Sequence, residues 1–113
     1  MSEDHLRSGR RRDTVVFQSP VESRDRDGKL VQGWEDQFTV SAHVKPLRGS
    51  EAVMQARVSA RAPAILSVRL SAQTLRIMAD WRAVVEGRIF DLKELPRRTN
   101  RPRFLEMLVE AGG

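Results

Sequence analysis

"QFTVSAHVK", residues 37–45, is the most regular stretch of the chain. Its apolar residues occupy alternate positions, at Phe38, Val40, Ala42 and Val44. Because successive side chains of a β-strand point to opposite faces, this alternation predicts a strand with one buried face and one wet face. His43 falls on the polar face, which predicts an exposed residue rather than a ligand or a base. Pro46 cannot donate to a strand ladder and is expected to end the strand.

Further strands are predicted on both sides of this stretch. "TVVFQS" (14–19) is β-branched and aromatic, and Pro20 is expected to close it. "AILSVRL" (64–70) alternates in the same way as residues 37–45. "WRAVVEGRIFDLKEL" (81–95) holds two apolar runs joined at Glu86-Gly87, which is a hairpin signal.

Three other segments are less decisive. Residues 22–36 are polar and contain Asp27-Gly28, which predicts a loop or a loose hairpin. "TLRIMAD" (74–80) fits either a strand or a helical turn. "FLEMLVE" (104–110) also fits both, but its short apolar run beside so many strands favours a closing strand that covers a sheet edge.

The fold class that follows is mainly β. We expect a small antiparallel β barrel or sandwich of five to seven strands, with one long, partly helical connecting loop. Residues 1–13 are expected to form a flexible basic N-terminal arm, and residues 14–111 a single β-barrel domain. The alternating patterns predict a core of Phe38, Val40, Val44, Leu66, Val68, Val85, Phe90 and Leu92.

The long loop is predicted between Pro46 and Pro63. At about 18 residues it exceeds the usual 2 to 6 residues of a connection, and loops of this length are commonly functional or disordered. Ser50 and Glu51 have the character of a helix start, which predicts a short helix. The segment 45–61 carries one acidic residue and four basic residues, a net charge of +3; the basic residues are Lys45, Arg48, Arg57 and Arg61.

Composition excludes several classes of protein. The 113 residues contain no cysteine and only two histidines, so we expect no disulfide, no metal site and no cofactor. Nucleophile motifs and phosphate-binding glycine loops do not occur in the sequence, and an enzyme is not expected. No apolar run reaches the ~18 residues of a membrane span, and no leader is apparent, which predicts an intracellular protein without a membrane partner.

The net charge is +5, and 17 of the 20 basic residues are arginine. Arginine suits phosphate and interface ion pairs, so the excess is compatible with a polyanionic partner. A genome rich in G and C also raises the arginine content. Charge alone therefore does not establish a nucleic-acid partner.

Several weak motifs occur in the order and spacing of a known family. They are Trp34 in a glycine-containing loop, "VSAHV" (40–44), "PLRGSE" (46–51), Arg69 in "SVRL", Arg82, Gly87, "FDL" (90–92) and "FLEMLVE". Through these, residues 14–110 resemble the phage head-tail joining proteins, also called head closure or stopper proteins. One departure is Ser41, where the family often has Trp. It places the usual neighbour contact in doubt, but not the fold.

The resemblance implies a structural connector that forms a ring between a portal or adaptor ring and the tail, with a hexamer favoured and a dodecamer as the alternative. The expected partners are other copies of the chain, the portal or adaptor, tail terminator and tail proteins, and packaged double-stranded DNA. The expected location is the head-tail interface of a virion, or of a phage-like gene transfer agent, assembled in the host cytoplasm. In relatives the long loop points into the channel and holds DNA, which implies a DNA-facing role for Lys45, Arg48, Arg57 and Arg61.

Two alternatives remain open at this stage. The same loop is also suited to clasping a neighbouring subunit. A nucleic-acid-binding barrel is the alternative function, although such barrels usually stack bases on exposed aromatic residues, which are few here. The basic turn "RRTNRPR" (97–103) has no evident core role, so a subunit or neighbour interface is expected at Arg97, Arg98 and Arg101. Trp34 is expected at the same kind of interface.

Overall fold

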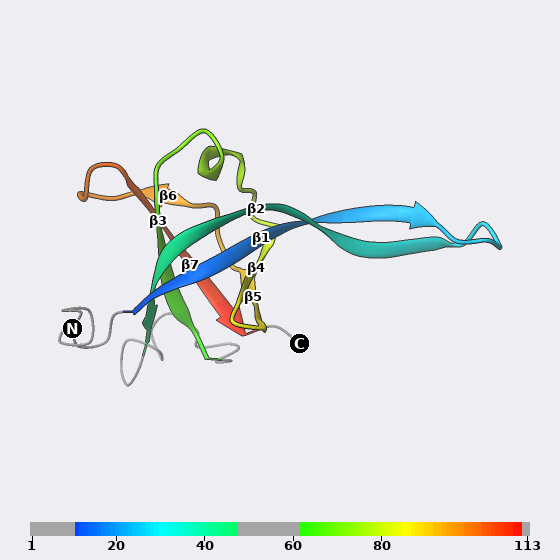
Figure 1. Cartoon of the computed structure of the whole chain (residues 1–113), viewed down its shortest axis with the longest axis horizontal. Coiled ribbons are helices and arrows are strands. Elements are labelled where there is room, and N and C mark those ends of the chain that lie inside the picture. Colours follow the sequence, from blue (N-terminus) through cyan, green and yellow to red (C-terminus); the bar gives the residue numbers. More distant parts are fainter. Residues whose placement is uncertain (1–10, 48–61, 112–113) are drawn as a thin grey trace.

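The computed structural model describes residues 11–47 and 62–111, which form seven strands and one short 3-10 helix (Figure 1). In chain order the elements are β1 (Arg11–Arg24), β2 (Leu30–Pro46), β3 (Ala64–Arg69), η2 (Thr74–Arg76), β4 (Arg82–Val85), β5 (Arg88–Leu92), β6 (Arg97–Arg98) and β7 (Phe104–Ala111). Within these ranges no helix has the length and hydropathy needed to cross a membrane.

The strands close on themselves. Every pairing is antiparallel, in the order β3-β2-β1-β4-β5-β7-β6, and β3 also pairs with β7. Six strands therefore complete a barrel, and the two-residue β6 extends one edge of β7. Closure removes the free edges that an open sheet would expose. The predicted mainly β, antiparallel barrel is confirmed.

The core fills the barrel with side chains from every long strand. Of the eight predicted core residues, six are buried, and Val40 and Val44 are half-buried against the same cluster. At one end of the barrel the Phe17 and Phe38 rings lie 5.5 Å apart, and Phe38 lies 6.0 Å from Trp81. Such tilted aromatic pairs stabilise beyond the area that they bury.

Local signals explain the turns and the last strand. Glu86 and Gly87 form the predicted hairpin turn, with φ angles of 51° and 79° as a two-residue type I′ turn requires. The ambiguous segment 104–110 is a strand, as predicted. In the open segment 74–80, Thr74 begins the 3-10 helix, and its buried hydroxyl donates to the carbonyl of Arg69 at 2.8 Å.

Two predicted boundaries of β1 were wrong. The strand begins at Arg11 rather than at residue 14, because residues 11–13 pair with 42–44 of β2. Pro20 does not end it, and the strand continues to Arg24. Beyond residue 18 only β2 pairs with β1, and a proline is tolerated in a strand that has a ladder on one edge alone.

The paired ends of β1 and β2 leave the barrel as a two-stranded ribbon, residues 18–36, which we call the arm (Figure 1). Where a loop or loose hairpin was predicted, the strands stay in register up to the pair Arg24–Leu30. Gly28, at φ 80°, closes the turn, and its N–H donates to the carbonyl of Asp25. The molecule consequently measures 53 Å along the arm but only 32 and 28 Å across.

The connection between β2 and β3 leaves the barrel at the opposite end of β2 from the arm tip. Its two ends meet there, since the N–H of Leu47 donates to the carbonyl of Pro63 at 3.0 Å. Residues 1–10 and 48–61 lie outside the described residues. The predicted partly helical loop therefore stays a prediction.

Candidate functional site: the arm and a basic groove

The arm is braced on one face by a side-chain cluster at its base. Arg82, on β4, stacks over the ring of Trp34 with its guanidinium carbon 4.2 Å from the ring centroid. The same guanidinium donates to Gln18 at 2.7 Å, and Gln18 donates to Asp36 at 2.7 Å. These contacts join the barrel wall to both strands of the arm.

A bulge braces the other face. The register of β1 against β2 shifts between Phe17 and Gln18, which leaves Gln37 as an extra residue in β2. Its amide nitrogen donates to Ser19 at 2.9 Å, and its amide oxygen accepts from Arg76 of the 3-10 helix at 3.0 Å. Bulges increase local twist and redirect a strand. Gln37 therefore changes the direction of β2 where the arm leaves the barrel, and its hydrogen bonds hold the arm in that direction.

From Trp34 at its base outward, the arm exposes apolar side chains to water. Four large ones are between 36% and 55% exposed: Val21, Leu30, Val31 and Trp34. The pairing of Pro20 with Trp34 and of Arg24 with Leu30 places those residues on one face, together with Glu22. Residues 18–36 carry five acidic and three basic side chains, a net charge of −2 in a chain of +5.

At the other end of the molecule the outer wall of β2, β3 and β7 forms a shallow groove of about 300 Å³, which we call the basic groove. Its lining includes Arg12, Ser41, Arg69 and Phe104. Two arginines pack against the Phe104 ring. The guanidinium carbons of Arg69 and Arg101 lie 5.7 Å and 4.3 Å from its centroid. The groove thus combines an aromatic ring with cations that can pair with an anion.

The predicted basic turn borders this groove, and its arginines differ in role. Arg97 forms an ion pair with Glu94, whose carboxylate also accepts the N–H of Leu108 at 2.9 Å. Arg101 is half-buried over Phe104, whereas Arg98 is exposed. Arg101 therefore packs against the barrel, contrary to the expectation that this turn has no core role.

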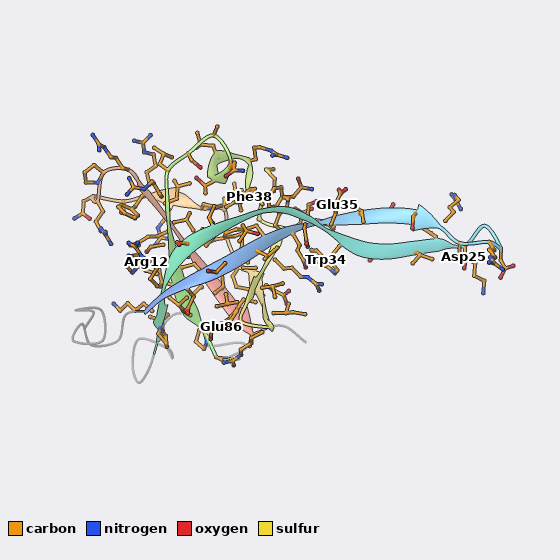
Figure 2. All side chains as sticks on the ribbon, in the orientation of Figure 1. Arg12, Asp25, Trp34, Glu35, Phe38 and Glu86 are labelled. Carbon is orange, nitrogen blue, oxygen red and sulfur yellow. The ribbon has the colours of Figure 1, made fainter. Side chains whose placement is uncertain are left out.

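The other predicted site residues are separated in space. Lys45 is exposed near the end of β2 where the long connection starts, and Trp34 lies at the base of the arm. Arg48, Arg57 and Arg61 lie outside the described residues. In Figure 2 the labelled Asp25 lies at the arm tip, and the labelled Arg12 lies on the far side of the barrel from it.

The arm as an exposed surface, and Arg12 and Arg69 as neighbours in the basic groove, were not predicted from the sequence. Asp27-Gly28 was a usable signal, because this dipeptide between apolar residues is typical of a hairpin. The polar composition of residues 22–36 concealed it. Within residues 11–47 and 62–111, no group of three or more acidic or histidine side chains could hold a metal ion.

Comparisons with known proteins agree with this architecture. A family model described as "Phage head completion protein" matches residues 6–112. The structure is similar to that of protein SF1141 from Shigella flexneri 2a, with 26% identity over 95% of this chain and 97% of that chain and a TM-score of 0.71. It also has the fold of a chain in the virion of a native gene transfer agent particle, with 20% identity, 85% and 89% coverage and a TM-score of 0.55. No curated protein matches the sequence.

Proposed function

Because the chain belongs to the phage head completion protein family, we propose that it is a head closure protein, a connector between the portal or adaptor ring and the tail. Membership makes it a structural component of the phage virion, located in the particle. The finer role that we propose has three parts: a ring of copies, a surface on which the tail docks, and retention of packaged DNA.

The observation that carries this proposal is the braced arm on a closed barrel. The barrel completes its own core and its own strand pairing without the distal half of the arm. The arm nevertheless exposes large apolar side chains on both of its faces, and exposed apolar surface of this kind is typical of a site of contact with another protein. A protein that connects other proteins needs such a contact surface.

The long connection supports the DNA-retaining part of the proposal. It starts and ends at one barrel end, away from the arm, and its sequence holds Arg48, Arg57 and Arg61. In a ring, copies of this segment would multiply a modest charge into a positive collar for the DNA end. Phosphate contacts of this kind need no base readout. A clasp between subunits is the alternative role for the same segment.

Particles test the assignment directly. The gene would be deleted from the phage or gene transfer agent, and the full chain, carrying an epitope tag, would be supplied in trans. We expect heads without tails in the deletion, restored tailed particles with the tagged chain, and gold label confined to the head-tail junction. Label spread over the capsid, or normal tailed particles in the deletion, would refute the assignment. A chain that shifts labelled DNA as a monomer and never enters particles would instead be a nucleic-acid-binding module.

A further inference from the structure

We propose that the arm of one copy docks in the basic groove of the next copy, head to tail, and that this contact joins the subunits of the ring. The proposal rests on the proposed function, because it identifies the contact by which copies of a connector would assemble. The occupant of the groove is thus a second copy of this chain, and the inserted element is residues 19–35.

The positions of the two surfaces suit a ring. The arm and the basic groove lie at opposite ends of the long axis, as the labelled Asp25 and Arg12 indicate (Figure 2). A contact between two different patches is heterologous, and repeating it turns each copy by the same rotation. Such a contact gives a closed ring if the rotation closes. An arm that paired with another arm would give only a dimer.

The two surfaces are also complementary in chemistry. The inserted residues 19–35 have a net charge of −1, from four acidic and three basic side chains, and they place Glu22 and Arg24 on the same face as Leu30 and Trp34. The groove is lined by Arg12, Arg69 and Phe104, and Arg69 lies over the Phe104 ring. A ribbon with exposed apolar side chains and a small negative net charge therefore meets an aromatic and basic wall.

The bracing of the arm favours docking without rearrangement. The contacts of Arg82 and Gln37 hold the base of the ribbon on both of its faces. An isolated two-stranded ribbon is marginally stable in water, so these contacts fix its direction before a partner arrives. A preorganised element loses less conformational entropy on binding.

Cross-linking between introduced cysteines tests the contact, because the chain contains no cysteine of its own. The variant Leu30→Cys/Ser41→Cys places one thiol on the arm and one in the groove, both at exposed positions. Particles carrying it would be treated with a flexible bismaleimide. We expect a ladder of covalent oligomers larger than dimers, and none from either single variant. The control Leu95→Cys/Ser41→Cys pairs the groove with a leucine that is 55% exposed, as Leu30 is, but lies outside the arm.

The outcomes separate the two proposals. If the double variant enters particles but stays monomeric after cross-linking, the arm contact is refuted and the connector function stands. A strong dimer from Leu30→Cys alone would show arm-to-arm pairing and would also refute it. If the wild-type chain is absent from particles, the proposed function fails as well.

A second variant measures the contribution of the apolar contact without a cross-linker. Leu30→Ser should reduce the number of copies retained per purified particle at least fivefold, since it removes an exposed leucine from the docking face. Leu95→Ser, at an equally exposed position, should leave the copy number unchanged. Equal retention of the two variants would contradict the proposal.

Discussion

At the scale of single residues, the aromatic end of the barrel and the base of the arm are neighbouring but different environments. Phe17 is fully buried and pairs with Phe38, so it belongs to the core. Trp34, which precedes Phe38 by four residues in β2, is 40% exposed and has an arginine over one face. Substitutions should therefore have large effects at the first site and small ones at the second.

Replacing Phe17 by alanine should lower the free energy of unfolding by about 3–5 kcal/mol, because the barrel cannot collapse fully into the space left. Val21→Ala, on the exposed part of the same strand, should change it by less than about 0.5 kcal/mol. Denaturant titration followed by far-UV circular dichroism measures both. A small loss for Phe17→Ala would contradict the placement of this ring in the core.

The stacking of Arg82 on Trp34 should appear as coupling in a double-mutant cycle. For this partly exposed cation–π pair we expect about 0.5–1 kcal/mol of interaction free energy. Unfolding of Arg82→Ala, Trp34→Ala and the double variant gives the value. The matched cycle of Arg88 with Trp34 should show none, since Arg88 lies over Phe90 instead; coupling there would point to a nonlocal effect.

At the scale of elements, a glycine in a turn and a glycine in a strand differ in backbone conformation. Gly87 adopts a φ of 79° in the turn between β4 and β5, whereas Gly33 lies in the extended backbone of β2. A Cβ at Gly87 would meet nothing within 4 Å, and at Gly33 it would meet only Val21 Cγ2 at 3.9 Å. Space for a Cβ is available at both sites, so the backbone conformation determines how a substitution changes stability.

Gly87→Ala should destabilise the protein by about 1–2 kcal/mol, because an L-residue in the left-handed region is strained. Gly33→Ala should be neutral or stabilising by up to about 1 kcal/mol, because alanine restricts the unfolded chain and fits the strand. Thermal or denaturant unfolding of the pair checks the sign. The reverse order of stability would be inconsistent with the two backbone conformations.

The distal arm should be removable without loss of the barrel. Replacing residues 22–32 by Asn-Gly joins the paired Val21 and Gly33 through a two-residue turn. All of the deleted side chains are exposed, so the free energy of unfolding should change by no more than about 1 kcal/mol. A monomer that loses cooperative unfolding would mean that the arm belongs to the folding unit of the barrel.

At the scale of the whole molecule, the barrel separates two projections. The arm leaves one end of β2, and the connection of residues 46–63 leaves the other. One rigid body can thus engage a neighbouring copy through the arm while it presents a basic segment elsewhere. This division allows the proposed ring contact and the proposed DNA contact to be changed separately.

Removing the positive charge of the connection should weaken DNA retention without preventing assembly. In the variant Arg48→Gln/Arg57→Gln/Arg61→Gln, filled heads should release more nuclease-sensitive DNA before a tail docks, and the release should increase with salt. The matched variant with lysine at the same three positions keeps the charge and should retain DNA. If the glutamine variant retains DNA as well as the wild type does, the clasp role is the better explanation.

The sequence by itself determined the class of fold and most of the core. Alternation at Phe38, Val40 and Val44 has the period of a strand, and Glu86-Gly87 has the residues that a type I′ turn needs, so local chemistry was sufficient for both. The tertiary structure alone decided the closure of the barrel through β3 and β7 and the extent of the arm. It also brought Arg12, Arg69 and Phe104 together in one groove. The physical reason is that these features depend on strand pairing between residues far apart in the chain, and a local pattern shows which face a side chain takes but not which strand lies beside it.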